Sequence, residues 1–221
     1  MCIRDRVTSP LSLVVTAFAP VRNSRNTLTP ELRTDLGSTE LWLVDLGQGK
    51  NRLGASALAY VYDELGHTAP NLDDGGMLRK FFEAIQKLNE NGLLLAYHDR
   101  SDGGLWATLC EMAFAGRTGL DIDVSALGTD TIRALFAEEL GAVVQIKAQD
   151  RAEFMALIEA QGLAACTHLV GAPSGDGRIR VHGNGQVVLD QELLSLYADW
   201  IETSHHIQAV SYTHLTLPTK A

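Results

Sequence analysis

The order of apolar and polar residues along the chain predicts an alternation of strands and helices. Short apolar or alternating runs, which are typical of strands, cover residues 11–18, 40–46, 93–98, 119–124, 142–148 and 168–171. Apolar residues spaced three and four apart, which mark one buried helix face, cover residues 55–65, 77–91, 105–115, 130–140, 150–161 and 192–202. The helix at 77–91 has the clearest stripe and is followed by Gly92, a residue type that commonly ends helices.

A hairpin and an alternating strand are mixed into this succession. Residues 183–185 (GNG) separate two short apolar runs, 178–181 and 187–189, and this composition favours a tight hairpin turn. Residues 119–124 alternate in the manner of a half-buried strand. The sequence therefore predicts a mixed α/β (α+β) fold, a sandwich built on a mixed sheet, and not a purely parallel, doubly wound sheet.

The two ends of the chain do not share the pattern of the rest. Residues 1–6 show no period, and residues 209–221 do not continue the preceding helical stripe. Both ends resemble translated sequencing-adapter read-through, so we exclude them from arguments on fold and function. We expect residues 7–38 to hold the last strand of a preceding subdomain and a polar linker, and residues 39–208 to form the main domain. The native sequence is then expected to begin in the middle of a protein, at about Val7.

Composition narrows the classes of function. The 221 residues suffice for one domain with additions or for two small ones, and a hydrophobic content of 46% is ordinary for a globular protein. The formal net charge is -9 and the pI is about 5.2, without a cluster of basic residues. Binding to nucleic acid is therefore not expected. No apolar run approaches the roughly 18–20 residues of a membrane helix, so we expect no membrane partner.

The cysteines favour a reducing compartment. Cys2, Cys110 and Cys166 form no Cys-x-x-Cys pair, and their number is odd. This spacing excludes a zinc finger and a disulfide framework, and it favours a cytoplasmic location. Cys110 follows an inward leucine on a predicted helix, so we interpret it as a small buried apolar residue and not as a nucleophile.

The best candidate for chemistry is the segment 99–104 (DRSDGG), between a predicted buried strand and a predicted helix. Loops at the carboxyl ends of strands are where α/β sheets bind ligands, and free N–H groups at a helix start favour an anion such as phosphate. Asp99 offers the hard oxygen ligand that Mg²⁺ prefers, and the Ser101 hydroxyl could reach a phosphate or ribose. The alternative is a capping loop, in which Ser101 or Asp102 caps the helix and Asp99 is solvated.

A second glycine-rich loop, 47–54 (GQGKNRLG), also precedes a predicted helix. Its glycines, Lys50 and Arg52 would suit a phosphate, but no Gly-Lys-Ser/Thr ends it, so it is not a Walker A sequence. A plain turn with exposed basic residues is the favoured interpretation of this loop.

Two further groups of polar residues are interpreted as structural. Glu138 and Glu139 fall near the end of a predicted helix, where their charges oppose the helix dipole. We interpret them as part of a solvated face. His98 lies beside the DRSDGG loop and is interpreted as a core or strand-end histidine.

Five blocks of the sequence stand out, in order: TSPLSL (8–13), LGASAL (53–58), YHDRSDGGL (97–105), EMAFAG (111–116) and EELGAV (138–143). Together they resemble the large single-chain form of phosphoribosylformylglycinamidine synthase. The resemblance runs from about Val7 to about Gln208. It implies a fold like the C-terminal domain of aminoimidazole ribonucleotide synthetase, here the C-terminal subdomain of the second synthetase half.

The resemblance also implies an activity and a site. The family uses ATP and glutamine to convert formylglycinamide ribonucleotide to formylglycinamidine ribonucleotide in purine biosynthesis. By the resemblance, Asp99 is a magnesium ligand and Ser101 contacts ATP. The partners it implies are ATP or ADP, the ribonucleotide substrate, and the missing synthetase subdomains and glutaminase domain of the same protein. No cysteine here matches the glutaminase nucleophile, so we expect the fragment alone to be inactive.

Three alternatives stay open beside this interpretation. The subdomain could be a non-catalytic half that holds a nucleotide for structural reasons. It could belong to another ATP-dependent enzyme of the same fold, such as a thiamine-phosphate kinase or a selenophosphate synthetase. A plain protein-interaction domain is the remaining alternative.

Overall fold

The computed structural model describes residues 14–21 and 23–213, in which seven strands form one mixed sheet. The strands are β1 (Thr39–Asp45), β2 (Ala96–Asp99), β3 (Gly119–Asp123), β4 (Gly141–Lys147), β5 (Thr167–Ser174), β6 (Arg178–Gly183) and β7 (Gln186–Glu192). The helices are α1 (Ala57–Val61), α2 (Gly75–Glu90), α3 (Gly104–Gly116), α4 (Thr131–Phe136), α5 (Arg151–Ala160) and α6 (Leu193–Thr213). Short 3-10 helices are η1 (Ser24–Asn26), η2 (Ser125–Leu127), η3 (Ala148–Asp150) and η4 (Ala164–Cys166).

The strand order is β2-β4-β1-β5-β3-β6-β7. Neighbouring strands pair antiparallel except for β3 and β6, which are parallel. Because β1 and β2 both pair antiparallel with β4, they run in the same direction and end at the same edge of the sheet. This arrangement brings the loops that follow β1 and β2 together.

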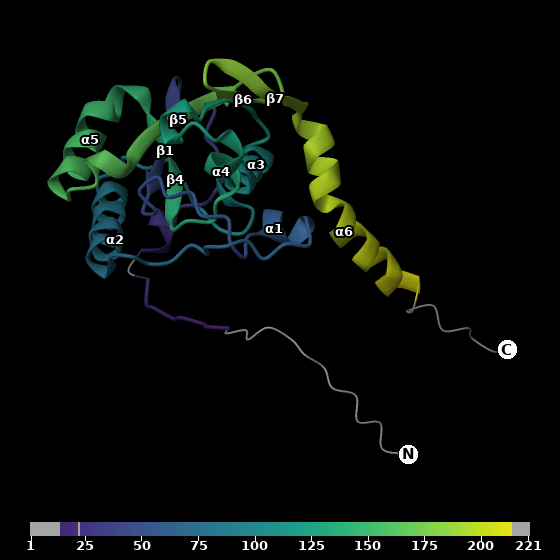
Figure 1. The fold of residues 1–221 in the computed structure, drawn as a ribbon. Coiled ribbons are helices and arrows are strands. Elements are labelled where there is room, and N and C mark those ends of the chain that lie inside the picture. The colour runs from purple at the N-terminus through teal and green to yellow at the C-terminus, as the bar shows by residue number, and fades with distance from the viewer. Residues whose placement is uncertain (1–13, 22, 214–221) are drawn as a thin grey trace.

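Helices cover both faces of the sheet (Figure 1). One core cluster joins α3 and α4 to the sheet, and the other joins α2 and α5 to its opposite face. In β1, Leu41 and Leu43 belong to the first cluster and Trp42 and Val44 to the second, as expected because successive strand side chains point to opposite faces. The predicted mixed α/β sandwich is therefore confirmed.

The strand predicted at 11–18 is wrong for the residues that the structure describes. Residues 14–18 form no strand, and residues 11–13 lie outside the described part of the chain. Val14 and Phe18 are exposed. A strand must pair its backbone N–H and C=O groups, and no strand of the described sheet is paired with this run.

Three helices differ from the predictions by more than two residues at a boundary. The helix predicted at 55–65 is reduced to α1, because its apolar stripe faces solvent and the left-handed backbone at Ala55 and Asp63 flanks it. The helix predicted at 130–140 ends at Phe136. The last helix was predicted to end at residue 202 but continues to Thr213, into the segment that was excluded as a tail.

The strand predicted at 93–98 is shifted toward its carboxyl end. Its observed counterpart, β2, ends at Asp99, which pairs with Ala142 of β4. No helix among the described residues is long and apolar enough to span a membrane.

Candidate functional site

Three loops that are far apart in the sequence meet at one edge of the sheet. They are the loop after β1 (47–54), the loop after β2 (100–103), and the segment between α4 and β4 (137–140). The start of β4 lies between the ends of the other two strands, since Gly141 pairs with Asp45 and Ala142 with Asp99. The two candidate loops predicted from the sequence are therefore neighbours, with the two glutamates between them.

A buried ion pair fastens the loop after β2 to β1. Arg100 Nη2 donates to Asp45 Oδ1 at 2.5 Å, and the two side chains are 1% and 4% exposed. Arg100 also donates to the backbone carbonyls of Glu139 and Leu140. Because a charge is costly to bury without a partner, Arg100 stabilises the loop and is not free to bind a ligand.

The same aspartate orders the glycine-rich loop. The backbone N–H groups of Gly47 and Gly49 donate to the two carboxylate oxygens of Asp45, at 3.0 and 2.7 Å. Asp45 is thus shared between the first loop and the second. The N–H groups of these glycines point at a carboxylate, which leaves them unavailable as a phosphate cradle.

Glu139 holds the first loop from the other side. Its carboxylate, which is fully buried, accepts hydrogen bonds from the backbone N–H and from the guanidinium of Arg52. Those hydrogen bonds raise the pKa of Arg52 above its ordinary value, so the guanidinium stays charged. The prediction that Glu139 is solvated and that Arg52 is an exposed basic residue is therefore wrong.

Glu138 connects the loop after β2 to the start of α1. Its Oε1 accepts hydrogen bonds from the backbone N–H groups of Gly103 and Ala57, both at 2.8 Å. A carboxylate is favoured there because the N-terminal end of a helix presents unpaired N–H groups and a partial positive charge. Glu138 and Glu139 thus cross-link the three loops, which corrects their interpretation as a solvated face.

Asp99 is the one predicted ligand that points to solvent from a fixed position. It is exposed, its backbone pairs with β4, and its Oδ1 accepts a hydrogen bond from the Tyr97 hydroxyl at 2.5 Å. Burial, this hydrogen bond and the charge of Asp99 all raise the pKa of the Tyr97 phenol, which therefore stays a donor at neutral pH. Among the described residues, no Lys, Arg or His forms an ion pair with Asp99.

The capping interpretation of this loop is not supported. The N-cap of α3 is Gly103 in the left-handed conformation, and neither Ser101 nor Asp102 caps the helix with its side chain. Ser101 and Asp102 are both exposed. Ser101 contributes its backbone carbonyl to the turn by accepting a hydrogen bond from the Gly104 N–H.

His98 is held between the backbone and a helix. Its Nδ1 lies 2.7 Å from the carbonyl oxygen of Asp99, and its Nε2 lies 2.8 Å from Glu111 of α3. Since a carbonyl can only accept, Nδ1 carries the proton in this contact. The predicted role as a strand-end histidine is confirmed.

The chemistry of these residues fits a magnesium–nucleotide site in part. Mg²⁺ in nucleotide sites takes one or two carboxylates together with phosphate oxygens and water. Asp99 offers one such carboxylate, with Oδ2 free of the contact that Oδ1 makes. No group of three or more metal-binding side chains occurs among the residues that the structure describes. A site with a single carboxylate would hold Mg²⁺ only together with the phosphate oxygens of a nucleotide.

A small cavity of about 330 Å³ lies beside the first loop. Its lining includes Asp45, Gln48, Cys166 and His168. Burial lowers the pKa of His168, and the charge of Arg100 acts in the same direction while that of Asp45 opposes it. The imidazole is therefore neutral at physiological pH, and burial likewise raises the pKa of the Cys166 thiol.

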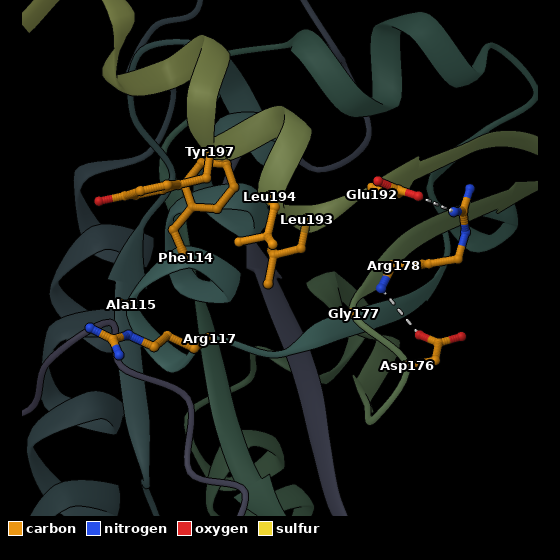
Figure 2. Close-up of a pocket in the computed structure, with 10 residues that line it drawn as sticks. All are labelled: Phe114, Ala115, Arg117, Asp176, Gly177, Arg178, Glu192, Leu193, Leu194 and Tyr197. Atoms are coloured by element: carbon orange, nitrogen blue, oxygen red, sulfur yellow. Dashed lines mark hydrogen bonds and ion pairs between the residues drawn. The ribbon is translucent and has the colours of Figure 1, made fainter. Parts of the chain in front are cut away.

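A larger cavity of about 920 Å³ lies at the other end of α3 (Figure 2). Helix α3 has 13 residues, so its two ends lie roughly 20 Å apart at 1.5 Å per residue. Figure 2 shows Phe114 beside Tyr197, with Arg178 turned toward Glu192. None of the lining residues belongs to the three loops. This cavity is therefore separate from the candidate site.

Cys110 lies on α3 between these two regions. It is 6% exposed, and burial, with the charge of Glu111, raises the pKa of its thiol to about 12. The thiolate is the nucleophilic form, so Cys110 is confirmed as a buried apolar residue.

Comparison with known proteins places this architecture in a family. Residues 40–183 match the profile described as AIR synthase related protein, C-terminal domain. Among solved structures, Thermotoga maritima PurL complexed with FGAR is similar, with a TM-score of 0.65 and 15% identity over 78% of this chain and 30% of that one. The same protein complexed with ATP has a TM-score of 0.60 and 13% identity, over 77% of this chain and 27% of that one.

A second kind of relative shares the fold. E. coli HypE, a hydrogenase maturation protein, has a TM-score of 0.50 and 20% identity over 72% of this chain and 51% of its own. The chain thus spans under a third of the PurL chains and about half of HypE. Because the family profile covers well over half of the sequence, the chain belongs to the AIR synthase related family, and residues 40–183 are its C-terminal domain.

Proposed function

We propose that this chain is a fragment of phosphoribosylformylglycinamidine synthase, a cytoplasmic ATP-dependent carbon–nitrogen ligase with glutamine as amido donor. In this proposal residues 39–208 are the C-terminal subdomain of the second synthetase half, and residues 7–38 are the end of the preceding subdomain and a linker. The chain supplies part of a magnesium–nucleotide site and is inactive alone. The family membership and the similarity to PurL structures complexed with ATP, ADP, AMPPCP and FGAR support it.

The observation that carries the proposal is the state of Asp99. Its carboxylate is exposed and anchored at the end of a strand, and no described cationic side chain neutralises it. Asp99 is the magnesium ligand in this proposal, and the hydroxyl of Ser101, two residues further along the chain, contacts the nucleotide. Bound Mg²⁺ would neutralise charge on the phosphate oxygens. The Arg100–Asp45 pair keeps the loop after β2 in place for this contact, and the Arg52–Glu139 pair holds the neighbouring loop after β1.

The test is Mg²⁺-dependent binding of ADP, measured by calorimetry. The 221-residue chain is titrated alone and with the preceding synthetase subdomain supplied as a second polypeptide. We expect Asp99→Asn to weaken binding strongly and to abolish its dependence on Mg²⁺. Asp102→Asn is the matched control, because Asp102 is an exposed aspartate of the same loop. A folded protein that binds no ADP in either form, or an Asp99→Asn variant that binds like the wild type, would refute the proposal.

A second candidate is another ATP-dependent enzyme of the same fold. The similarity to HypE favours it, since this chain covers about half of HypE and has a higher identity to it than to PurL. Binding of formylglycinamide ribonucleotide to the reconstituted protein separates the two candidates, because only the synthase uses this substrate. A non-catalytic, nucleotide-holding half is distinguished by Asp99→Asn in the full-length enzyme, where it would lower stability and leave turnover unchanged.

A further inference from the structure

We infer that Tyr97 is a positioning residue for Asp99, which it orients for a divalent cation by a hydrogen bond to one carboxylate oxygen. The inference rests on the proposed function, because it takes Asp99 to be the magnesium ligand. It adds a residue for which neither the sequence motif nor the family match gives a role. Tyr97 itself does not contact the ion in this inference.

The geometry of β2 brings the two side chains together. Tyr97 and Asp99 are two residues apart on a strand, so their side chains point to the same face of the sheet. The Tyr97 ring packs against the core cluster formed by α2, α5 and the sheet. Its hydroxyl then reaches Asp99 Oδ1 at 2.5 Å. The ring is therefore held by packing, and the ring in turn holds the carboxylate.

The backbone of Asp99 is held as firmly as its side chain. Its carbonyl oxygen lies 2.7 Å from His98 Nδ1 and accepts a hydrogen bond from the Thr108 hydroxyl at 3.3 Å. The residue also pairs with Ala142. An exposed aspartate normally rotates among several conformers, and fixing it in advance lowers the entropy lost when it binds a ligand.

The kind of donor matters for the charge of the site. A lysine or arginine in the place of Tyr97 would orient Asp99 but would also neutralise it. The phenol is uncharged, so the carboxylate keeps its full negative charge, and only one of its two oxygens is used. The other oxygen remains for a hard cation, which prefers such ligands. Partners that orient a metal ligand in this way typically change metal affinity 10–100-fold when removed.

The competing interpretation is purely structural. A buried tyrosine hydroxyl usually finds a hydrogen-bond acceptor, and Asp99 could serve only that need. Under this interpretation, loss of the hydroxyl changes thermal stability and leaves metal affinity unchanged. The two interpretations therefore differ in a quantity that can be measured without any catalytic activity.

The experiment compares three variants with the wild type. Mn²⁺ replaces Mg²⁺ as the probe, and its binding in the presence of ADP is followed by electron paramagnetic resonance, in whichever form of the protein binds ADP. Tyr97→Phe keeps the packed ring and removes only the hydroxyl. Tyr197→Phe removes the same group from α6, where it lines the larger cavity at the other end of α3, and is the matched control. Asp99→Asn removes the proposed ligand charge. Circular dichroism and thermal melting are recorded for each.

We expect Tyr97→Phe to weaken Mn²⁺ binding roughly tenfold or more, with Tyr197→Phe unchanged and Asp99→Asn without measurable Mn²⁺ binding. If Tyr97→Phe bound Mn²⁺ with wild-type affinity while Asp99→Asn lost Mn²⁺ binding, the inference would be overturned and the proposed function would stand. Wild-type affinity in Asp99→Asn would overturn both.

Discussion

At the scale of single residues, the buried charged side chains in and beside the three loops pair with one another. Arg100 pairs with Asp45, and Arg52 pairs with Glu139, in both cases with little exposure of either side chain. Residues of this kind in a sequence motif suggest ligand binding, but here they hold the loops in place. Asp99 differs because it is exposed, has no cationic partner among the described residues, and is held in place by the hydrogen bond from the Tyr97 hydroxyl.

The Arg100–Asp45 pair leads to a prediction on stability. Arg100→Met leaves the buried Asp45 carboxylate without its cation and also removes hydrogen bonds to two carbonyls. Breaking one side of a buried pair typically costs about 3–5 kcal/mol, so we expect a loss of that size in the free energy of unfolding, measured by urea denaturation. Arg79→Met is the control, because Arg79 is 82% exposed and its pair with Glu83 is on the surface. Equal stability of the two variants would contradict a structural role for Arg100.

At the scale of elements, the turn from β2 into α3 sets the position of the site. Gly103 and Gly104 both adopt left-handed backbone conformations, with φ of 81° and 67°. A Cβ on Gly104 would lie 2.7–2.9 Å from backbone atoms of residues 135–137. The turn therefore requires glycine for its conformation and for the close approach of the segment that carries Glu138 and Glu139.

We predict that Gly104→Ala destabilises the protein, while Gly75→Ala does not. Left-handed strain alone costs about 1–3 kcal/mol, and the contact with rigid backbone adds to it. Gly75 is also the first residue of a helix, but it has an ordinary φ and no atom within 4 Å of an added Cβ. Alanine there is expected to stabilise the protein by a few tenths to about 1 kcal/mol. Thermal and urea unfolding of both variants check the difference, and a stable Gly104→Ala protein would contradict the prediction.

The sequence predicts most elements of this fold because their patterns are local. Helix α2 and strand β4 follow their apolar periods closely. The apolar spacing predicted too long a helix at α1. An apolar stripe indicates a helix only if another surface covers it, and Val61 and Leu65 are exposed.

The candidate site could be predicted only in part, for a related reason. The sequence singled out the two loops and both glutamates, but the partners of Glu138 and Glu139 lie 35 to 87 residues away. Periodicity and spacing carry no information on such contacts. The sequence did contain a signal that Tyr97 contacts Asp99. The two residues are two positions apart near the end of a predicted strand, where residues i and i+2 lie on the same face.

At the scale of the whole molecule, a segment outside the family match supports the site. Strand β2 lies at the edge of the sheet, and its Tyr97 N–H donates to the carbonyl of Thr29. Arg33 exchanges two hydrogen bonds with the buried Gln145 side chain, and Leu32 is 3% exposed within the core cluster of α3. Residues 28–33, predicted as part of a polar linker, thus cover the edge strand that carries Tyr97 and Asp99.

This cover leads to a prediction that connects stability with the site. Leu32→Ala removes a buried side chain, which typically costs about 2–5 kcal/mol, and it loosens the segment whose carbonyl accepts from Tyr97. We therefore expect lower stability and also faster hydrogen exchange at the Tyr97 amide, because an edge strand that loses its partner opens more often. Phe18→Ala, at a side chain that is 92% exposed, should change neither quantity. If Leu32→Ala lowered stability while the exchange of Tyr97 rose no more than that of core amides in α3, residues 28–33 would stabilise the domain as a whole without specifically protecting the strand that holds Asp99.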